Sequence, residues 1–190
     1  WDADAVDRLQ TPPTRCLLPP GALDRIRRRT GVDYVEVPPW TATRVGEVTI
    51  HAVPGPHTFP PPDEVNYVVD LPKWGRVFFG GDSRYDKANL QRIADVFAPI
   101  HLALLPVGGT RIFLRRTTMG PRDAYRASQV LGAQYVVPIH EGGRWPSIPP
   151  ASLHPGRGRH LARMFARRGA IGRVCCLEEG ESAVFPGASC

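Results

Sequence analysis

Three side chains that can bind a metal ion each come directly after a short apolar segment that is predicted to be a strand. They are His57, Asp82 and His140. Strand ends that meet at one edge of a sheet bring such side chains together. Neutral imidazole and carboxylate oxygen are ligands that zinc, manganese and iron accept. The sequence therefore predicts a metal site made by these residues, and Gly80 and Gly81 let the backbone turn sharply before Asp82.

The elements that position these residues follow from the spacing of apolar side chains. Alternation with a period of two predicts strands, and a period near 3.6 predicts helices. Predicted strands span residues 14–18, 34–37, 47–53, 65–71, 76–79, 101–107, 134–139, 174–177 and 182–185. Predicted helices span residues 2–9, 21–30, 88–97, 121–131 and 158–168. This order predicts an α/β fold with mixed sheets and helices packed outside, as a single domain over residues 1–190.

Composition narrows the classes of partner. The formal net charge is +6, which leaves a nucleic-acid or phosphate-bearing partner open. The arginines are spread over three helical segments without interleaved aromatics, so an ordinary solvated basic surface is favoured over a nucleic-acid or phosphate partner. No apolar run is long enough to cross a bilayer. The four cysteines form no disulfide framework and suit packed thiols in a reducing cytoplasm. A homo-oligomer remains open.

Five motifs occur in order along almost the whole chain and together resemble one family. They are AVPGPH (52–57), VFFGGDSR (77–84), LALLPVGG (102–109), MGPRDA (119–124) and VPIHEG (137–142). This set resembles the metallo-β-lactamase superfamily, and within it the ascorbate-6-phosphate-lactonase-like branch of metal-dependent hydrolases.

The resemblance implies an αββα sandwich with two divalent metal ions at one edge. Zinc is the favoured metal, with manganese or iron as alternatives. By position, the resemblance makes His57 a ligand of the first metal and His140 a ligand of the second. It makes Asp82 the bridge that positions both metals for catalysis.

One departure from the family pattern is large. The family supplies four further ligands from a His-x-His-x-Asp-His motif, and this motif is absent from the chain. In the family, a segment like WDADAVDRL (1–9) follows that motif directly. We therefore expect the chain to be the C-terminal portion of such a domain, with the first part of the N-terminal sheet missing. We also expect this portion alone to be inactive and not to fold stably, because two ligands per metal are too few and a sheet edge is exposed.

The remaining candidates support the same site less directly. Arg84 either binds a substrate phosphate or carboxylate or forms a surface salt bridge. Thr110 and Met119 are candidates to line the pocket. Glu141 either orients His140 or is solvated, and the solvated role is favoured. The other histidines are predicted to be structural or exposed: His51, His101, His154 and His160.

Three functions remain open from the sequence. The leading one is a hydrolase that uses a metal-activated water on a small anionic lactone or phosphoester. The second is a nuclease-like enzyme of the same fold, whose binding would weaken steeply with salt. The third is a truncated, non-catalytic binding module.

Overall fold

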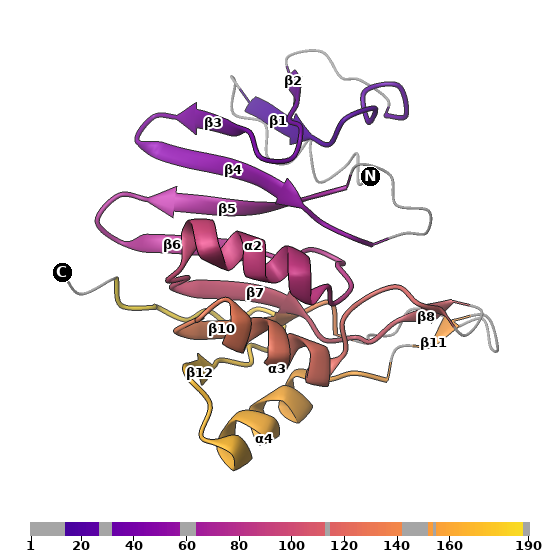
Figure 1. The fold of residues 1–190 in the computed structure, drawn as a ribbon, viewed down its shortest axis with the longest axis vertical. Helices are drawn as coiled ribbons and strands as arrows, with labels where there is room; N and C mark the ends of the chain where they lie inside the picture. The colour runs from indigo at the N-terminus through magenta and orange to yellow at the C-terminus, as the bar shows by residue number, and fades with distance from the viewer. Residues whose placement is uncertain are drawn as a thin grey trace.

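A seven-stranded mixed sheet forms the centre of the protein (Figure 1). The computed structural model describes residues 14–26, 32–57, 64–112, 115–141, 152–153 and 155–187. The sheet order is β12-β10-β7-β6-β5-β4-β3. Its strands are β3 (Ala42–Val45), β4 (Val48–Pro54), β5 (Val65–Leu71), β6 (Gly75–Phe79), β7 (Leu102–Pro106), β10 (Tyr135–Ile139) and β12 (Arg173–Val174). Strands β3 to β6 pair antiparallel, whereas β6, β7, β10 and β12 pair parallel.

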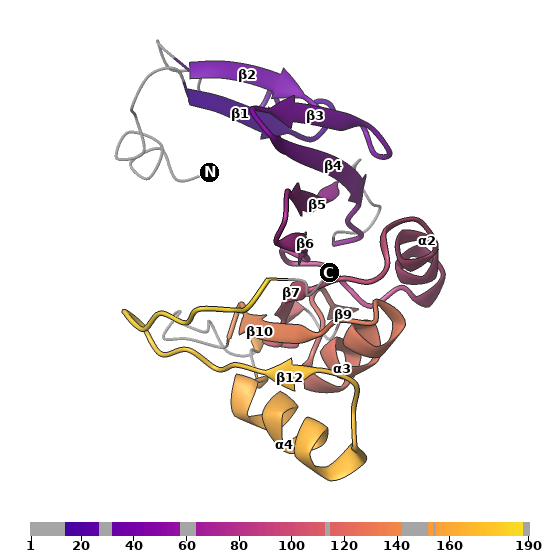
Figure 2. The same cartoon turned by 90° about the vertical axis from the view of Figure 1, so that its left-hand side faces the viewer.

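Three helices connect the parallel strands and cover one face of the sheet (Figure 2). They are α2 (Lys87–Phe97), α3 (Pro121–Val130) and α4 (Gly158–Arg168). Successive parallel strands joined by right-handed crossovers in one direction place their helices on the same side. The core lies between this layer and the sheet, and it includes Phe78, Ile93, Leu105, Val136 and Leu161. Among the described residues, no helix is long and apolar enough to cross a membrane.

The sheet has one closed face and one partly open face. In β10, Val136 and Pro138 are buried toward the helices, while the alternate residues are only half-buried. The C-terminal segment covers part of the open face. There the ring of Phe185 lies 5.3 Å from that of Tyr135, and its carbonyl accepts a hydrogen bond of 3.1 Å from Trp74 Nε1. The alternation of buried and half-buried residues along β10 has the period of two that is typical of a strand.

Two small sheets flank the large one. β1 (Thr14–Leu18) and β2 (Val32–Glu36) pair parallel, and their sheet lies beside the β3 end of the large sheet (Figures 1 and 2). β8 (Arg111–Ile112), β9 (Arg115–Arg116) and β11 (Ser152–Leu153) form the second. The predicted α/β class and the helices at residues 88–97, 121–131 and 158–168 are confirmed, within a residue at each end.

The helix predicted at residues 21–30 is wrong where the structure describes it. Residues 21–26 form isolated turns, in which Arg25 N–H donates to the Ala22 carbonyl at 3.0 Å. Gly21, at the predicted start, has a φ of +71°, which is outside the helical region. Leu23 N–H donates to Glu36 Oε1 of β2 at 2.9 Å. Tertiary contact with β2 therefore overrides the local helix propensity. The helix predicted at residues 2–9 lies outside the described residues.

The predicted closing strands are also shorter than expected. Only Arg173–Val174 pairs in the sheet, and one further bond links Cys175 N–H to the Val136 carbonyl at 2.9 Å. Residues 182–185 form no strand, and Val184 is 98% exposed. After a turn in which Glu178 N–H donates to Glu181 Oε2 at 2.9 Å, the chain lies on the open face of the sheet, where Phe185 contacts Tyr135, instead of pairing along an edge.

The cysteines are only partly packed: Cys16 and Cys175 are half-buried and Cys176 is exposed, so the predicted packing is wrong for Cys176. Cys16, Cys175 and Cys176 are free, and Cys190 lies outside the described residues. Burial raises the pKa of the Cys16 thiol. Burial also raises the pKa of Cys176, and the negative charges of Glu141, Cys175 and Glu178 add to the effect. Raised values keep these thiols protonated and poorly nucleophilic near neutral pH.

Candidate metal site

The structure brings the three predicted ligands to one hollow of about 430 Å³ at the edge of the sheet. His57 follows β4, Asp82 follows β6 and His140 follows β10. Asp82 Oδ1 lies 3.3 Å from His140 Nε2. The convergence expected from the strand ends is thus present in the fold.

The ring of His57 is held in the orientation that a metal ligand needs. Its Nδ1 lies 2.9 Å from the carbonyl oxygen of Thr117. A carbonyl can only accept, so Nδ1 carries the proton and Nε2 keeps its lone pair. The backbone N–H of His57 donates to Glu64 Oε2 at 2.7 Å, which fixes the main chain as well. Histidine ligands of metals commonly donate their second ring nitrogen to a carbonyl in this way.

The backbone around Asp82 is fixed by bonds to neighbouring strands and loops. Gly80 N–H donates to the Leu104 carbonyl at 2.9 Å, and Gly81 has a φ of +47°, which favours glycine. Ser83 Oγ donates to Asn66 Oδ1 at 2.9 Å in a buried contact. The Asp82 side chain itself remains exposed, so its carboxylate is available to a ligand.

His140 occupies a strained backbone conformation with a φ of +50°. For a residue that is not glycine this region is uncommon, and it occurs most often at functional positions. The loop after β7 packs tightly against it: a Cβ on Gly108 would lie 2.4 Å from the His140 carbonyl oxygen. The next residue, Glu141, accepts a hydrogen bond from Gly158 N–H at 2.7 Å. Glu141 therefore caps the start of α4 rather than being merely solvated, which corrects that expectation.

The donor chemistry fits part of a metal centre. Two imidazoles and a carboxylate line the hollow, with the His57 proton on Nδ1. However, within the described ranges no group of three His, Cys, Asp or Glu side chains is close enough to hold a metal ion together. Only Asp82 and His140 are in direct contact. The residues therefore form a partial ligand set that further donors would have to complete.

The other predicted pocket residues do not line this hollow. Met119 is 1% exposed in the core, so its predicted role in the pocket wall is wrong. Thr110 is buried, and its N–H donates to Thr118 Oγ1 at 2.9 Å. Arg84 is half-buried beside the site, and its backbone N–H donates to the Pro56 carbonyl at 2.7 Å. Its role toward a substrate stays a prediction.

Two histidines have the structural roles that were expected. His51 Nε2 lies 3.1 Å from Asp70 Oδ2. His101 Nδ1 accepts from Arg76 N–H at 2.9 Å. His160 lies on α4 and lines a second cavity, described below. His154 lies outside the described residues.

Sequence reasoning missed the residues that support the ligands. Glu64 and Asn66 line the hollow at the start of β5, and Thr117 supplies the carbonyl that orients His57. Glu64 and Asn66 are two residues apart, so they lie on one face of the chain, and Asn66 pairs with Val53 near the end of β4. This spacing could have indicated that both side chains lie near His57. Nothing local signals Thr117, because its bond to His57 spans 60 residues.

The fold and the sheet-edge donors define an α/β protein of the metallo-β-lactamase type. The beta-lactamase superfamily domain, taken as a family, matches residues 3–140, and the chain belongs to this family. It is 32% identical over 118 residues to a UPF0173 metal-dependent hydrolase of Thermococcus onnurineus, covering 62% of this chain and 44% of that protein. It is 28% identical over 151 residues to one of Pyrococcus furiosus, covering 80% and 54%. The chain thus spans about half the length of these relatives.

Solved structures agree on the fold. Igni18, a metallo hydrolase of Ignicoccus hospitalis, superposes with a TM-score of 0.67 at 20% identity, over 88% of this chain and 65% of that chain. An isothiocyanate hydrolase from Delia radicum gut bacteria superposes with a TM-score of 0.70 at 15% identity, over 97% of this chain and 72% of that chain. YhfI of Bacillus subtilis, a metallo-β-lactamase fold protein, superposes with a TM-score of 0.66 at 15% identity, over 93% of this chain and 68% of that chain. At these identities the likeness establishes the fold alone.

Proposed function

We propose that this chain carries part of the active site of a metal-dependent hydrolase, in which His57, Asp82 and His140 bind divalent metal ions. The observation that carries the proposal is the His57 ring, whose Nδ1 donates to the Thr117 carbonyl and leaves the Nε2 lone pair of the neutral ring available to a metal. The contact between Asp82 and His140 supports it independently. The names of the curated relatives point to the same class of activity.

The chain's own residues divide the work as follows. His57 would hold the first metal, His140 the second, and Asp82 would contribute to both, with zinc favoured over manganese or iron. Divalent ions bound there would activate water near neutral pH and polarise a substrate oxygen. Glu64 and the Thr117 carbonyl hold His57 in place, which keeps the ligand geometry organised.

The substrate we propose is a small anionic lactone or phosphoester, as in the ascorbate-6-phosphate-lactonase-like branch. The basic balance of the chain supports an anion, and the half-exposed Phe79 at the hollow offers an apolar wall for the rest of the molecule. The free thiols support a reducing, cytoplasmic setting.

A metal-dependence assay tests this function. The intact protein is offered a lactone and a phosphoester panel with Zn²⁺ or Mn²⁺, and again after dialysis against a chelator. Turnover that is lost on chelation and restored by the metal is expected. Turnover that survives chelation unchanged, or no turnover of either class by a folded, metal-loaded protein, contradicts the proposal.

Arg84 gives a separate prediction about substrate binding. Arg84→Ala should raise the KM for an anionic substrate about tenfold and change kcat less, because a guanidinium binds substrate and transition state alike through charge. Steady-state kinetics measures both constants. Arg92→Ala is the matched control. Arg92 lies on α2 outside the hollow, with its guanidinium carbon 4.2 Å from the centre of the Trp40 ring. An unchanged KM for Arg84→Ala would show that Arg84 has only a structural role.

A further inference from the structure

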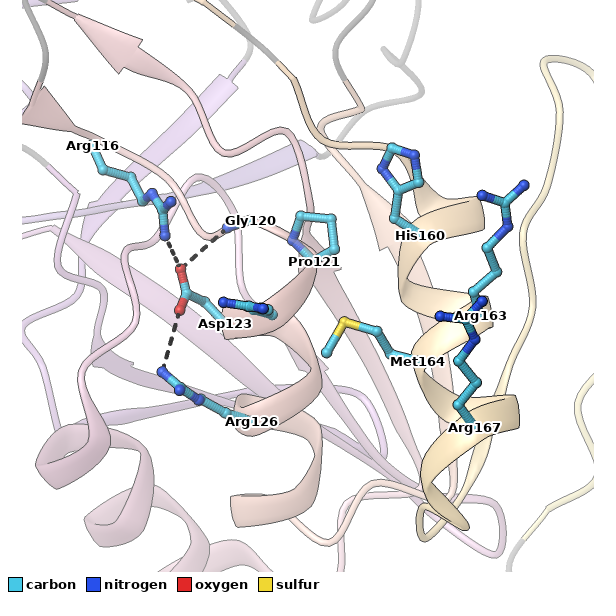
Figure 3. Close-up of a pocket in the computed structure, with 10 residues that line it drawn as sticks. Arg116, Gly120, Pro121, Asp123, Arg126, His160, Arg163, Met164 and Arg167 are labelled. Atoms are coloured by element: carbon cyan, nitrogen blue, oxygen red, sulfur yellow. Dashed lines mark hydrogen bonds and ion pairs between the residues drawn. The ribbon is translucent and has the colours of Figure 1, made fainter.

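A second cavity of about 540 Å³ lies between α3 and α4, away from the candidate metal site (Figure 3). Its wall is rich in arginine, and it shares no lining residue with the hollow that holds Asp82. It is lined by Arg116, Gly120, Pro121, Arg122, Asp123, Arg126, His160, Arg163, Met164 and Arg167. We call this cavity the arginine groove.

One buried carboxylate organises one wall of the groove. Asp123 is 9% exposed and lies 2.6 Å from Arg116 Nη1 and 4.0 Å from Arg126 Nη1. It also accepts from Gly120 N–H at 3.5 Å at the start of α3. Figure 3 shows the two guanidinium groups on either side of this carboxylate. Asp123 thus holds two of the arginines in fixed positions but offsets only one of their charges.

The other arginines of the groove have no acidic partner in the part of the chain that the structure describes. Within the described ranges, Arg122, Arg163 and Arg167 form no ion pair with a carboxylate. Arg163 and Arg167 lie one turn apart along α4, in a single row in Figure 3. Like charges at this spacing destabilise a helix. The groove therefore carries an excess of positive charge that a bound anion would relieve.

The shape and chemistry of the groove indicate the class of that anion. Guanidinium groups bind phosphate oxygens through two parallel hydrogen bonds. Side chains one helical turn apart are about 5–6 Å apart at Cβ, so the two helices can contact several phosphates at once. Among the described lining residues, His160 has the only aromatic ring, so the groove offers no row of aromatic side chains on which bases could stack. A volume of about 540 Å³ suits a small molecule rather than a strand.

We propose that the arginine groove binds a small ligand through a chain of two or more phosphate groups. Arg122 and Arg126 of α3 and Arg163 and Arg167 of α4 all line the groove and contact the phosphates. Met164 extends from α4 toward α3 in Figure 3. This site is independent of the metal-binding residues.

Calorimetric titration of the intact protein with sodium tripolyphosphate tests the proposal. Tripolyphosphate should bind at least about tenfold more tightly than orthophosphate, because more guanidinium contacts form. Arg163→Glu with Arg167→Glu should weaken tripolyphosphate binding at least about tenfold. The same double variant should still melt cooperatively without ligand, because Arg163 and Arg167 are exposed and form no ion pair with a carboxylate among the described residues.

Two controls separate the groove from general charge and from the metal site. Arg159→Glu with Arg173→Glu makes the same change of charge at exposed positions outside the groove and should alter affinity by less than about twofold. Asp82→Asn should leave binding of tripolyphosphate unchanged. Equal losses in both arginine double variants would overturn the proposal, as would a loss confined to Asp82→Asn. A single-stranded RNA oligonucleotide that binds more tightly than tripolyphosphate and displaces it would also overturn it.

Discussion

Asp82→Asn should reduce hydrolytic turnover by more than about 100-fold while leaving the fold intact. Loss of a residue that merely orients a metal ligand costs about 10–100-fold, and loss of a shared ligand should cost more. The asparagine is nearly the same size but lacks the negative charge that faces His140 at 3.3 Å. Because the Asp82 side chain is exposed, its replacement removes no core contact.

The measurement for Asp82 compares turnover and thermal melting in two variants. Asp95→Asn is the control, because Asp95 is an exposed residue on α2 that only accepts from Gln91 Nε2 at 3.0 Å. That variant should keep wild-type turnover. Retention of activity within about tenfold in Asp82→Asn, with a normal melting curve, would remove Asp82 from the catalytic site.

Gly156→Ala should destabilise the fold by more than about 3 kcal/mol. A Cβ at this position would lie 1.5 Å from the Val107 carbonyl oxygen, and backbone cannot move aside as a flexible side chain can. Gly156 N–H also donates to the Gly108 carbonyl at 2.8 Å, so the segment entering α4 is held directly on the loop after β7. Loss of this contact between Gly156 and the loop after β7 would displace both α4 and that loop, which packs on His140.

Denaturant unfolding of Gly156→Ala and Gly169→Ala separates steric clash from backbone strain. Gly169 ends α4 with a φ of +56° and has nothing within 4 Å of a built Cβ. Gly169→Ala should therefore cost only about 1 kcal/mol. Equal free energies of unfolding for the two variants would show that the close approach at Gly156 is not a fixed feature of the fold.

The candidate site could be predicted from sequence because its ligands follow regular strands. Alternation in residues 48–53 and the apolar run within residues 134–139 located the strand ends, and sheet geometry then brought His57 and His140 to one edge. The helices at 88–97, 121–131 and 158–168 were equally readable, because their apolar spacing is uninterrupted. These features depend on local periodicity alone.

The remainder depends on contacts between distant parts of the chain. The turn at residues 21–26 is set by Glu36, and the orientation of His57 by Thr117. The arginine groove forms only when α4 packs beside α3, where Phe165 meets Tyr125 edge-on at 5.4 Å. In sequence its arginines looked like separate solvated helix faces. Local patterns cannot report such pairings.

The groove and the metal site are joined by a short path through the loop before α3. The backbone N–H of Met119 donates to the carbonyl of Ser83, the residue after Asp82, at 2.8 Å. Gly120, the residue after Met119, lines the arginine groove. The two proposals remain separable, because substitutions at Arg163 and Arg167 touch neither Ser83 nor Asp82.

A native mass spectrum of the purified intact protein tests the central claim most directly, since it counts bound metal ions and reports chain mass together. The account predicts divalent metal on the wild-type protein and its loss from His57→Ala, Asp82→Asn and His140→Ala, with metal retained in His101→Ala. His101 serves as the control because its Nδ1 is occupied by the Arg76 N–H. A folded wild-type protein that carries no metal after incubation with Zn²⁺ or Mn²⁺, or variants that keep the full metal load, would contradict it.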